Sequence, residues 1–274
     1  MPTSLNTGIS GLQQFQRQIE VIGNNIANVN TTGYKSSRMN FEDSFSQALA
    51  GSGAATQVGS GVGLASINNN FKLGTLNRTG VTTDLAVSGN GFFMVQDAVT
   101  GVQYATRAGD FTVNSGGYLV TNDGLRVQGF NDGALATRGD LKIDVPAAVP
   151  PVVPPVTVKS FSIGTDGTIT VHGTDGVSFV RGQVLLQSFS APSQLIKEGN
   201  NLYSGMAGAG PLTAPAAPPT NGLGSIESGV LEMSNVDLTN EMTNLIMAQR
   251  AFTANSKTIS TSDEIMQEIN NLKR

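Results

Sequence analysis

Both ends of this 274-residue chain carry apolar residues at heptad spacing, and this feature constrains the fold more than any other. Near the start, one row is Leu5, Leu12, Ile19 and Ile26, and a second is Phe15, Ile22 and Val29. Near the end, the row is Leu238, Leu245, Phe252, Ile259 and Met266. A 3.5-residue period held over three or four heptads predicts terminal helices that pair as a coiled coil. Such ends around a long non-helical middle are typical of subunits that stack into assemblies.

The composition of the chain suits a turn-rich β protein between these helices. Glycine accounts for 33 residues, and charged residues make up only 13 %. The net charge of −4 argues against a nucleic-acid partner, which would need a basic surface. There is no cysteine, so thiol nucleophiles and thiolate metal ligands are excluded. His172 is the only histidine, which excludes a multi-histidine metal site.

The N-terminus has no feature of a cleavable secretory signal. Residues 1–16, MPTSLNTGISGLQQFQ, contain neither a basic start nor a continuous apolar stretch. No window approaches the roughly 18 apolar residues that a spanning helix needs, so we expect a chain that does not span a membrane. The chain should remain in the cytoplasm unless it is exported by a route that reads no standard signal.

The N-terminal helical part is expected over residues 1–50. The first helix should begin near Thr3 or Ser4 and end in the turn-forming run 28–33. Three interior glycines each cost it about 1 kcal/mol relative to alanine, so it should need a partner. A second short helix is predicted over residues 41–49, because Phe41, Phe45 and Leu49 are spaced four apart.

A flexible linker is predicted at 51–64 from its Gly- and Ser-rich composition, and a β-rich domain follows at 65–230. Six short strands are expected at 84–87, 92–95, 104–106, 111–113, 118–121 and 125–130. FTVNSGGYL at 111–119 and FSIGTDGTI at 161–169 both predict hairpins, either as a true repeat or because hairpins look alike. The core should contain Phe92, Phe111, Leu119, Phe130, Phe161, Ile169 and Leu185.

The end of the chain, 231–274, is predicted to complete the helical part. A Pro-rich loop at 146–155 interrupts the β domain and cannot belong to a central strand. Residues 234–237, Ser-Asn-Val-Asp, look like a capping box that opens the last helix, with Asp237 favourable at its positive end. We therefore predict an α+β fold, with paired terminal helices and a mainly antiparallel β domain between them.

No motif in the sequence indicates catalysis or a cofactor. His172 lies where a strand runs into a turn, which suits a surface histidine better than a catalytic base. The glycine runs at 59–63 and 89–91 are followed by neither a helix start nor a P-loop lysine. The carboxylates are scattered rather than paired for acid–base work. We expect no enzyme and no cofactor.

Two interpretations of the heptad rows remain. Amphipathic helices packed on their own β domain would show similar spacing. Assembly is favoured because the rows sit at the extreme ends of the chain and the other helix faces carry Asn, Gln and Ser with little charge. Arg250 and Lys257 either form a solvated flank or pair between subunits of a filament.

Several motifs closely resemble the signatures of the bacterial flagellar rod and hook axial proteins. The N-terminal signature is SGL at 10–12 followed by IGNNIANVNTTGYK at 22–35. The C-terminal one is SNVDL at 234–238, then AQRAF at 248–252 and NSK at 255–257. In the middle, TDLAVSGNGFF at 83–93 and YATRAGDF at 104–111 resemble the first strands of that family's β domain. The resemblance covers both ends and much of the middle.

The resemblance implies a self-assembling subunit of a hollow tube that transmits torque and conducts exported flagellar proteins. Its partners would be copies of itself, neighbouring rod, hook and junction proteins, and the flagellar type III export apparatus, which needs no cleaved signal peptide. Besides the heptad rows, the residues implied in assembly are Asn24, Asn25, Asn28, Gly33, Tyr34 and Lys35, with Ser234, Asn235, Asp237, Gln249, Arg250 and Asn255. Gly33 is expected to need a positive φ, because it follows a helix end and turns the chain.

Within this family, the sequence has features of both the hook protein and the distal rod protein. The opening SLNTGISGLQQFQ and the short segment before Ile67 favour a hook-type protein. The overall length and the segment around Asn200 favour the distal rod protein as the alternative. Outside this family, a secreted β-rich binding protein, a hydrolase or an adhesin-like protein would be the competing class. The weakly stable helices also predict ends that become ordered only on assembly.

Overall fold

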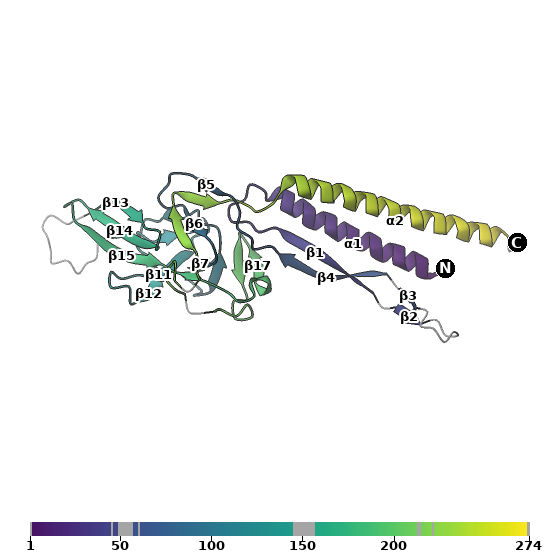
Figure 1. The fold of residues 1–274 in the computed structure, drawn as a ribbon, viewed down its shortest axis with the longest axis horizontal. Coiled ribbons are helices and arrows are strands. Elements are labelled where there is room, and N and C mark those ends of the chain that lie inside the picture. Colours follow the sequence, from purple (N-terminus) through teal and green to yellow (C-terminus); the bar gives the residue numbers. More distant parts are fainter. Residues whose placement is uncertain are drawn as a thin grey trace. The chain divides into compact units, whose positions relative to one another are not determined.

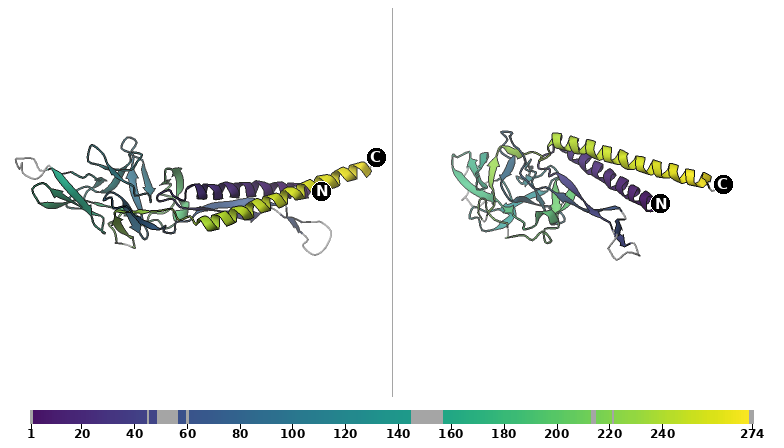
Figure 2. Two further views of the ribbon diagram at one scale, coloured as in Figure 1. Left: turned by 90° about the horizontal axis from the view of Figure 1, so that it is seen from above. Right: turned by 45° about the vertical axis from the view of Figure 1, so that its right-hand side comes forward.

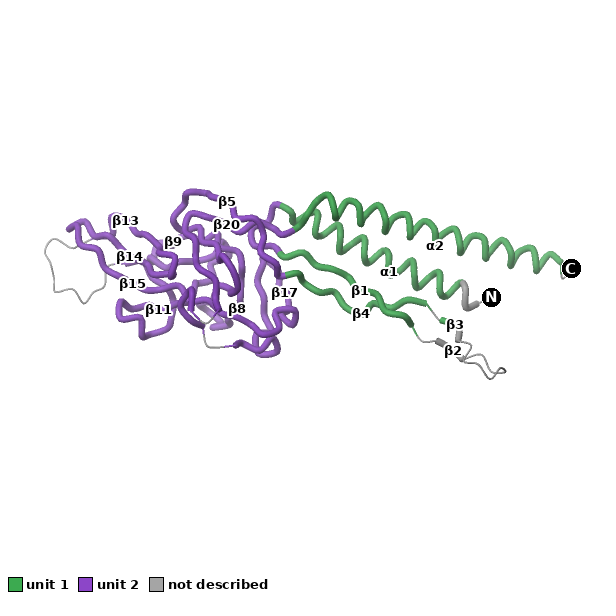
Figure 3. Tube along the Cα trace, in the orientation of Figure 1, with its two compact units in different colours: residues 1–29, 35–70, 236–274 green, residues 30–34, 71–235 purple. Residues whose placement is uncertain are grey.

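The computed structural model describes residues 2–44, 46–48, 57–59, 61–144, 157–212, 215–220 and 222–272. Two compact units divide the chain (Figure 3). Unit 1 comprises residues 1–29, 35–70 and 236–274, and unit 2 comprises residues 30–34 and 71–235. Each unit is therefore assembled from segments that lie far apart in the sequence. The expected Pro-rich loop at 146–155 lies outside the described residues.

Unit 1 is built on two long helices, α1 (Pro2–Ala27) and α2 (Leu238–Leu272), which lie side by side in Figures 1 and 2. They are antiparallel. A Cβ added at Gly8 would stand 3.0 Å from Ile259 Cγ1, and one at Gly11 would stand 2.5 Å from Asn255 Nδ2. The glycines that weaken α1 as an isolated helix thus let α2 approach it closely. The predicted terminal helices are confirmed.

A β-hairpin completes unit 1 and corrects the prediction of a second helix at 41–49 over residues 41–44 and 46–48; Phe45 and Leu49 lie outside the described residues. Strand β1 (Ser37–Asp43) pairs antiparallel with β4 (Val62–Asn69), and β2 (Ser46–Ala48) pairs with β3 (Gln57–Gly59). Side chains four apart share a face in a strand as well as in a helix, so the spacing of Phe41, Phe45 and Leu49 could not separate the two. The segment 51–64, expected to be a linker, enters strands at 57–59 and 62–64.

The hairpin packs on α1. The ring of Phe41 lies 5.8 Å from that of Phe15, and the Val62 N–H donates to Ser10 Oγ at 3.4 Å. A β-bulge between Asn40 and Phe41 shifts the register of β1 against β4. An added residue of this kind increases the local twist of the strand.

Unit 2 is a mainly antiparallel β structure, as predicted. Its main sheet follows the order β13-β14-β15-β11-β7-β8-β18-β17, and β9, β10, β12 and β16 join it off this path. These strands are β7 (Phe92–Gln96), β8 (Gln103–Thr106), β9 (Thr112–Val113), β10 (Leu119–Val120), β11 (Arg126–Phe130), β12 (Arg138–Asp140), β13 (Val158–Ile163), β14 (Thr168–Gly173), β15 (Ser178–Val184), β16 (Leu186–Gln187), β17 (Ile196–Gly199) and β18 (Leu202–Ser204). Two smaller pairs accompany the sheet: β6 (Leu85–Ser88) with β19 (Ser225–Ser228), and β5 (Leu76–Arg78) with β20 (Val230–Glu232). A short 3₁₀ helix, η1, spans Pro192–Gln194.

The six expected strands and both expected hairpins are present, with strand bounds shifted by at most one residue. In the hairpins, β9 pairs with β10, and β13 pairs with β14. Five of the predicted core residues are buried: Phe92, Phe111, Leu119, Ile169 and Leu185. Phe130 and Phe161 are only half-buried, although Phe161 still packs against the main apolar core.

The core of unit 2 consists of two apolar clusters. The larger is centred on Phe93 and Phe111, whose rings meet edge to face at 5.2 Å. The smaller includes Phe92, Phe189 and Tyr203 on the other face of β7. Adjacent residues Phe92 and Phe93 therefore anchor different clusters, which is the two-residue alternation of a strand buried on both faces.

Candidate assembly interface

The three asparagines of the N-terminal motif lie at the end of α1, where helix carbonyls lack intrahelical donors. The Asn28 side-chain amide donates to the Asn24 carbonyl at 2.9 Å and to Asn24 Oδ1 at 2.8 Å. The Asn28 backbone N–H also reaches the Asn24 carbonyl at 3.2 Å. Asn24 and Asn28 therefore close the last turn of the helix.

Asn25 has a different role, because it is almost fully buried at 1 % exposure. Its Nδ2 donates to the Ser37 carbonyl at 2.8 Å and its Oδ1 accepts from the Ser37 N–H at 2.9 Å. One side chain thus satisfies both backbone groups at the start of β1. Burial raises the pKa of Glu241 on α2, and a hydrogen bond with Asn25 opposes this shift. Asn25 therefore links α1, β1 and α2 within unit 1.

Gly33 belongs to unit 2 and has the predicted positive φ, at +67°. Its N–H donates to the Glu232 carbonyl at 2.7 Å. A Cβ at this position would lie 2.5 Å from the Ala108 backbone nitrogen and 2.7 Å from the Arg107 carbonyl carbon. Glycine is required both by the backbone conformation and by the close approach of another backbone segment.

Tyr34 and Lys35 follow directly and are both buried. The Lys197 ammonium lies 4.5 Å from the centroid of the Tyr34 ring, a distance typical of a cation–π contact. Burial lowers the pKa of Lys197. Lys35 is fully buried, which is rare for a lysine.

A buried ion pair lies beside Gly33. Arg107 Nη1 stands 3.3 Å from Glu232 Oε2, and the two side chains are 4 % and 0 % exposed. Glu232 Oε1 also accepts from the Gly74 N–H at 2.9 Å, while Arg107 Nη2 donates to the Gly89 carbonyl at 2.8 Å. The guanidinium lies 5.0 Å from the Phe92 ring centroid. Burial lowers the pKa of Arg107, and Glu232 opposes that shift.

Neither member of this pair was predicted from the sequence. Arg107 lies inside the motif YATRAGDF, and Glu232 is an isolated acid between apolar residues in GVLEMSN. A lone charge in a largely apolar run is a signal that could have marked Glu232, whereas Arg107 lies among polar residues and has no such signal. The sequence contains no indication that the two would meet, because 125 residues separate them.

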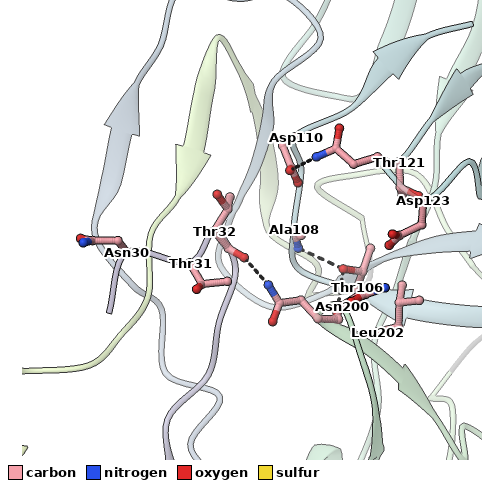
Figure 4. A pocket seen from close by; sticks show the side chains of 12 residues that line it. Asn30, Thr31, Thr32, Thr106, Ala108, Asp110, Thr121, Asp123, Asn200 and Leu202 are labelled. Carbon is pink, nitrogen blue, oxygen red and sulfur yellow. Dashed lines mark hydrogen bonds between the residues drawn. The ribbon is translucent and has the colours of Figure 1, made fainter. Parts of the chain in front are cut away.

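A polar hollow of about 360 Å³ lies against the N-terminal motif in unit 2 (Figure 4). Asn201 Nδ2 donates to the Thr32 carbonyl at 2.7 Å, and Thr106 Oγ1 donates to the Asn201 carbonyl at 2.9 Å. On the other side, Asn122 Nδ2 donates to Asp110 Oδ2 at 2.6 Å. Burial raises the pKa of Asp110, and the nearby Asp84 contributes in the same direction. Thr106 thus positions Asn201, and Asn201 holds the backbone at Thr32.

The face that α1 buries coincides with the predicted apolar rows only at Ile22. Its most buried residues are Gly8, Gly11, Gln14, Ile22 and Asn25. The predicted seam residues Leu5, Leu12, Phe15, Ile19 and Ile26 are only half-buried. The hairpin β1–β4 and the glycine contacts to α2 select a face with small and polar residues. Apolar side chains of α1 consequently remain partly exposed.

The seam of α2 is divided in the same way. Leu245 and Ile259 are half-buried, whereas Leu238, Phe252 and Met266 are exposed at 43 %, 36 % and 38 %. Ala248 is the most buried residue of the helix. A helix that leaves much of its apolar row exposed has surface available for further packing.

The C-terminal motif contributes at three separate places. Asp237 caps α2, since its Oδ1 accepts from the N–H groups of Thr239 at 2.9 Å and Asn240 at 3.3 Å. This corrects the predicted capping box, in which Ser234 would have been the cap. Ser234 is instead buried, and Asn235 Nδ2 donates to the Lys72 carbonyl at 3.1 Å.

The remaining motif residues lie along α2. Asn255 packs against Gly11, whereas Gln249 and Arg250 are exposed and line a shallow hollow on the helix surface. The structure therefore separates the motif residues into those that organise one chain and those that face outward.

The candidate residues for catalysis or metal binding do not form a cluster in the described part of the structure. His172 lies on β14, and its Nδ1 is 2.7 Å from Ser178 Oγ. Across the described ranges, no group of three or more His, Asp or Glu side chains is placed to hold a metal ion. In the same part of the chain, neither helix is apolar enough over a sufficient length to cross a membrane.

Three family models match the chain. They are the flagella basal body rod protein model at residues 5–35, the flagellar hook protein FlgE/F/G D1 domain at 86–171, and the flagellar basal body rod FlgEFG protein C-terminal model at 227–272. Both terminal motifs and the middle motifs that carried the resemblance lie within or at the edge of these matches.

The chain is also similar to curated proteins along its whole length. It is 42 % identical to the flagellar basal-body rod protein FlgG of Bacillus subtilis and 34 % identical to that of Borreliella burgdorferi, with all of each chain covered. The flagellar hook protein FlgE of Borreliella burgdorferi is 26 % identical, again over both full chains. These similarities do not support the expected preference for a hook-type protein.

The first prediction concerns the close approach at Gly33. Gly33→Ala should destabilise the chain by about 2–5 kcal/mol, since a positive φ costs about 1–2 kcal/mol and overpacking adds about 1–3 kcal/mol. Gly80→Ala is the matched control, because Gly80 has φ +75° but no atom within 4 Å of an added Cβ. Urea unfolding of both variants measures the difference, and equal losses at the two positions would contradict the proposed clash.

The second prediction concerns the ion pair. Glu232→Gln should cost about 3–5 kcal/mol of stability, because Arg107 would keep its buried charge without a counter-charge. Asp140→Asn removes the more exposed Arg126–Asp140 pair and should cost less than about 1 kcal/mol. Chemical denaturation compares the two variants. A loss at Glu232 as small as that at Asp140 would show that the buried pair does not hold unit 2 together.

Proposed function

Because the chain belongs to the flagellar rod and hook axial protein family, we propose that it is the distal rod subunit of the flagellar basal body. This family is structural and is not a family of enzymes. The observation that carries the proposal is the end-to-end similarity to FlgG rod proteins, which exceeds the similarity to the hook protein FlgE. In this role the chain forms a hollow tube that transmits torque and conducts exported flagellar proteins.

The exposed apolar residues of the helices support self-assembly. Along α2, Leu238, Met242, Ile246 and Phe252 each expose more than a third of their surface. Apolar exposure sustained along one helix is typical of a surface that is buried in an assembly. In the tube, α1 and α2 would pair as a coiled coil and pack against helices of neighbouring copies.

The motif residues would act by holding each unit in one arrangement. Asn25 fixes the start of β1 against α1, and Gly33 fixes the first connection of unit 2 beside the ion pair. Ordered junctions of this kind are needed in a tube that carries torque, because every subunit must present the same surfaces. Other rod proteins, the hook and junction proteins would contact the ends of the tube.

A hook subunit is the alternative within the family, supported by the FlgE similarity and by the opening SLNTGISGLQQFQ. Either member would reach the flagellum through the type III export apparatus, without a cleaved signal peptide. The competing class, a binding or adhesin-like protein, requires a saturable small-ligand site in unit 2. The hollow beside residues 30–34 is where such a site would be sought.

Deletion of the gene in the source bacterium tests the proposal. Electron micrographs of isolated basal bodies should show a rod that stops short and carries no hook. Expression of the full chain from a plasmid should restore the rod and motility. A complete rod without a hook would instead identify a hook subunit, and intact flagella would refute an axial role altogether.

The same proposal predicts ends that are ordered by neighbours. Helix α1 contains three glycines, and the buried Oε1 of Gln14 has no hydrogen-bond partner among the described residues. Limited proteolysis of the soluble subunit should remove about 30 residues from each end and leave a resistant β fragment. The polymer should resist the same treatment. Ends that resist protease equally before and after assembly would contradict this prediction.

A further inference from the structure

Helix α2 has an outer face that does not contact α1. This outer face consists of Met247, Arg250, Lys257, Glu264, Ile265 and Glu268, all exposed. At 100° per residue these six fall within one side of the helix. The residues that meet α1, including Ala248, Asn255 and Ile259, fall on the opposite side. The outer face is therefore free within one chain.

Charge is divided along this face. Arg250 and Lys257 make its first half basic, and Glu264 and Glu268 make its second half acidic. In the described part of the chain, none of these four side chains forms an ion pair. A shallow hollow of about 450 Å³ lies between the two basic residues and is lined in part by Ile246 and Ala254. A face with a basic half and an acidic half is complementary to a copy of itself that is suitably displaced.

Helix α2 also extends beyond its partner. The contacts of Gly8 with Ile259 and Gly11 with Asn255 set the register of the two helices. Carried to the start of α1 at Pro2, that register ends at about residue 265 of α2. The last turns of α2 therefore have no α1 beside them, and they expose Ile269 at 44 % and Leu272 at 86 %. Apolar surface at this end can be covered only from outside the pair.

We propose that the outer face of α2 packs in parallel against the outer face of α2 in a second copy of this chain, displaced along the helix by 11–14 residues. This inference rests on the proposed function, because subunits of a growing tube share one orientation. Arg250 lies 14 residues before Glu264, and Lys257 lies 11 residues before Glu268. A displacement in this range, about 16–21 Å along the helix, therefore brings basic residues of one copy beside acidic residues of the next.

The same charges disfavour the other arrangements in a tube. Without displacement, Arg250 and Lys257 would face the same cations of the neighbour, and like charges oppose association. An antiparallel pair would match the charges, but it would close into a dimer and could not propagate. Each exposed ion pair contributes little to affinity. The charges therefore select the register, while apolar contacts of Met247, Ile265 and Leu272 provide most of the affinity.

Two charge-reversal variants of the full chain test the proposal. Arg250→Glu with Lys257→Glu makes the outer face acidic throughout, and Glu264→Lys with Glu268→Lys makes it basic throughout. Neither variant alone should form polymers under conditions in which the unchanged protein does. An equimolar mixture should polymerise again with the two variants alternating, because each then finds its complement on both sides. Sedimentation and negative-stain micrographs measure polymer length.

The control variant is Arg138→Glu with Lys159→Glu, which makes the same change in net charge on unit 2 as the Arg250→Glu, Lys257→Glu variant makes on α2 and should polymerise normally. Circular dichroism should show unchanged helix content in all variants. Either outer-face variant polymerising alone, or a mixture that yields no polymer or only closed two-copy complexes, would overturn the proposal while leaving the rod assignment intact. Failure of the unchanged protein to polymerise would overturn the rod assignment as well.

Discussion

The buried ion pair between Arg107 and Glu232 is the interaction on which the organisation of unit 2 depends. Taking two charges out of water costs several kcal/mol for each ion, and the cost is offset only where the remaining hydrogen-bonding groups are satisfied. Here the carboxylate accepts from Gly74 and the guanidinium donates to Gly89, while the Glu232 carbonyl accepts from Gly33. The pair thus joins five separate parts of the chain. Such a network favours one arrangement of these segments over looser alternatives.

Unit 1 depends on a different constraint, namely glycines in α1 at the contact with α2. Gly8 and Gly11 bring α2 close to α1, at the cost of weakening α1 as an isolated helix. Asn25 then connects the helix to β1 with two hydrogen bonds from one amide. Because small and polar residues make these internal contacts, many apolar residues of both helices remain available to pack against other subunits. We interpret this division as the physical basis of assembly in the proposed rod.

On the outer face of α2, the charges determine the register in which two copies pack. Apolar residues can hold two helices together in many registers, whereas a basic half and an acidic half allow few. A tube needs such selectivity because a single wrong offset would be propagated through every later subunit. The charges on this helix are few, and Arg250, Lys257, Glu264 and Glu268 are all on one side. These four charges act mainly by excluding other registers, and they add little to the affinity of the contact.

The sequence by itself determined the terminal helices, the short antiparallel strands and the positive φ of Gly33, because periodicity and turn chemistry act over a few residues. It could not decide between helix and strand at 41–49, where a spacing of four fits both. Only the tertiary structure decided which face of α1 is buried, because that depends on the hairpin and on α2, more than 200 residues away. The same holds for Arg107 and Glu232. Neither local sequence shows a partner for its charge, and only their meeting in the fold makes their burial favourable.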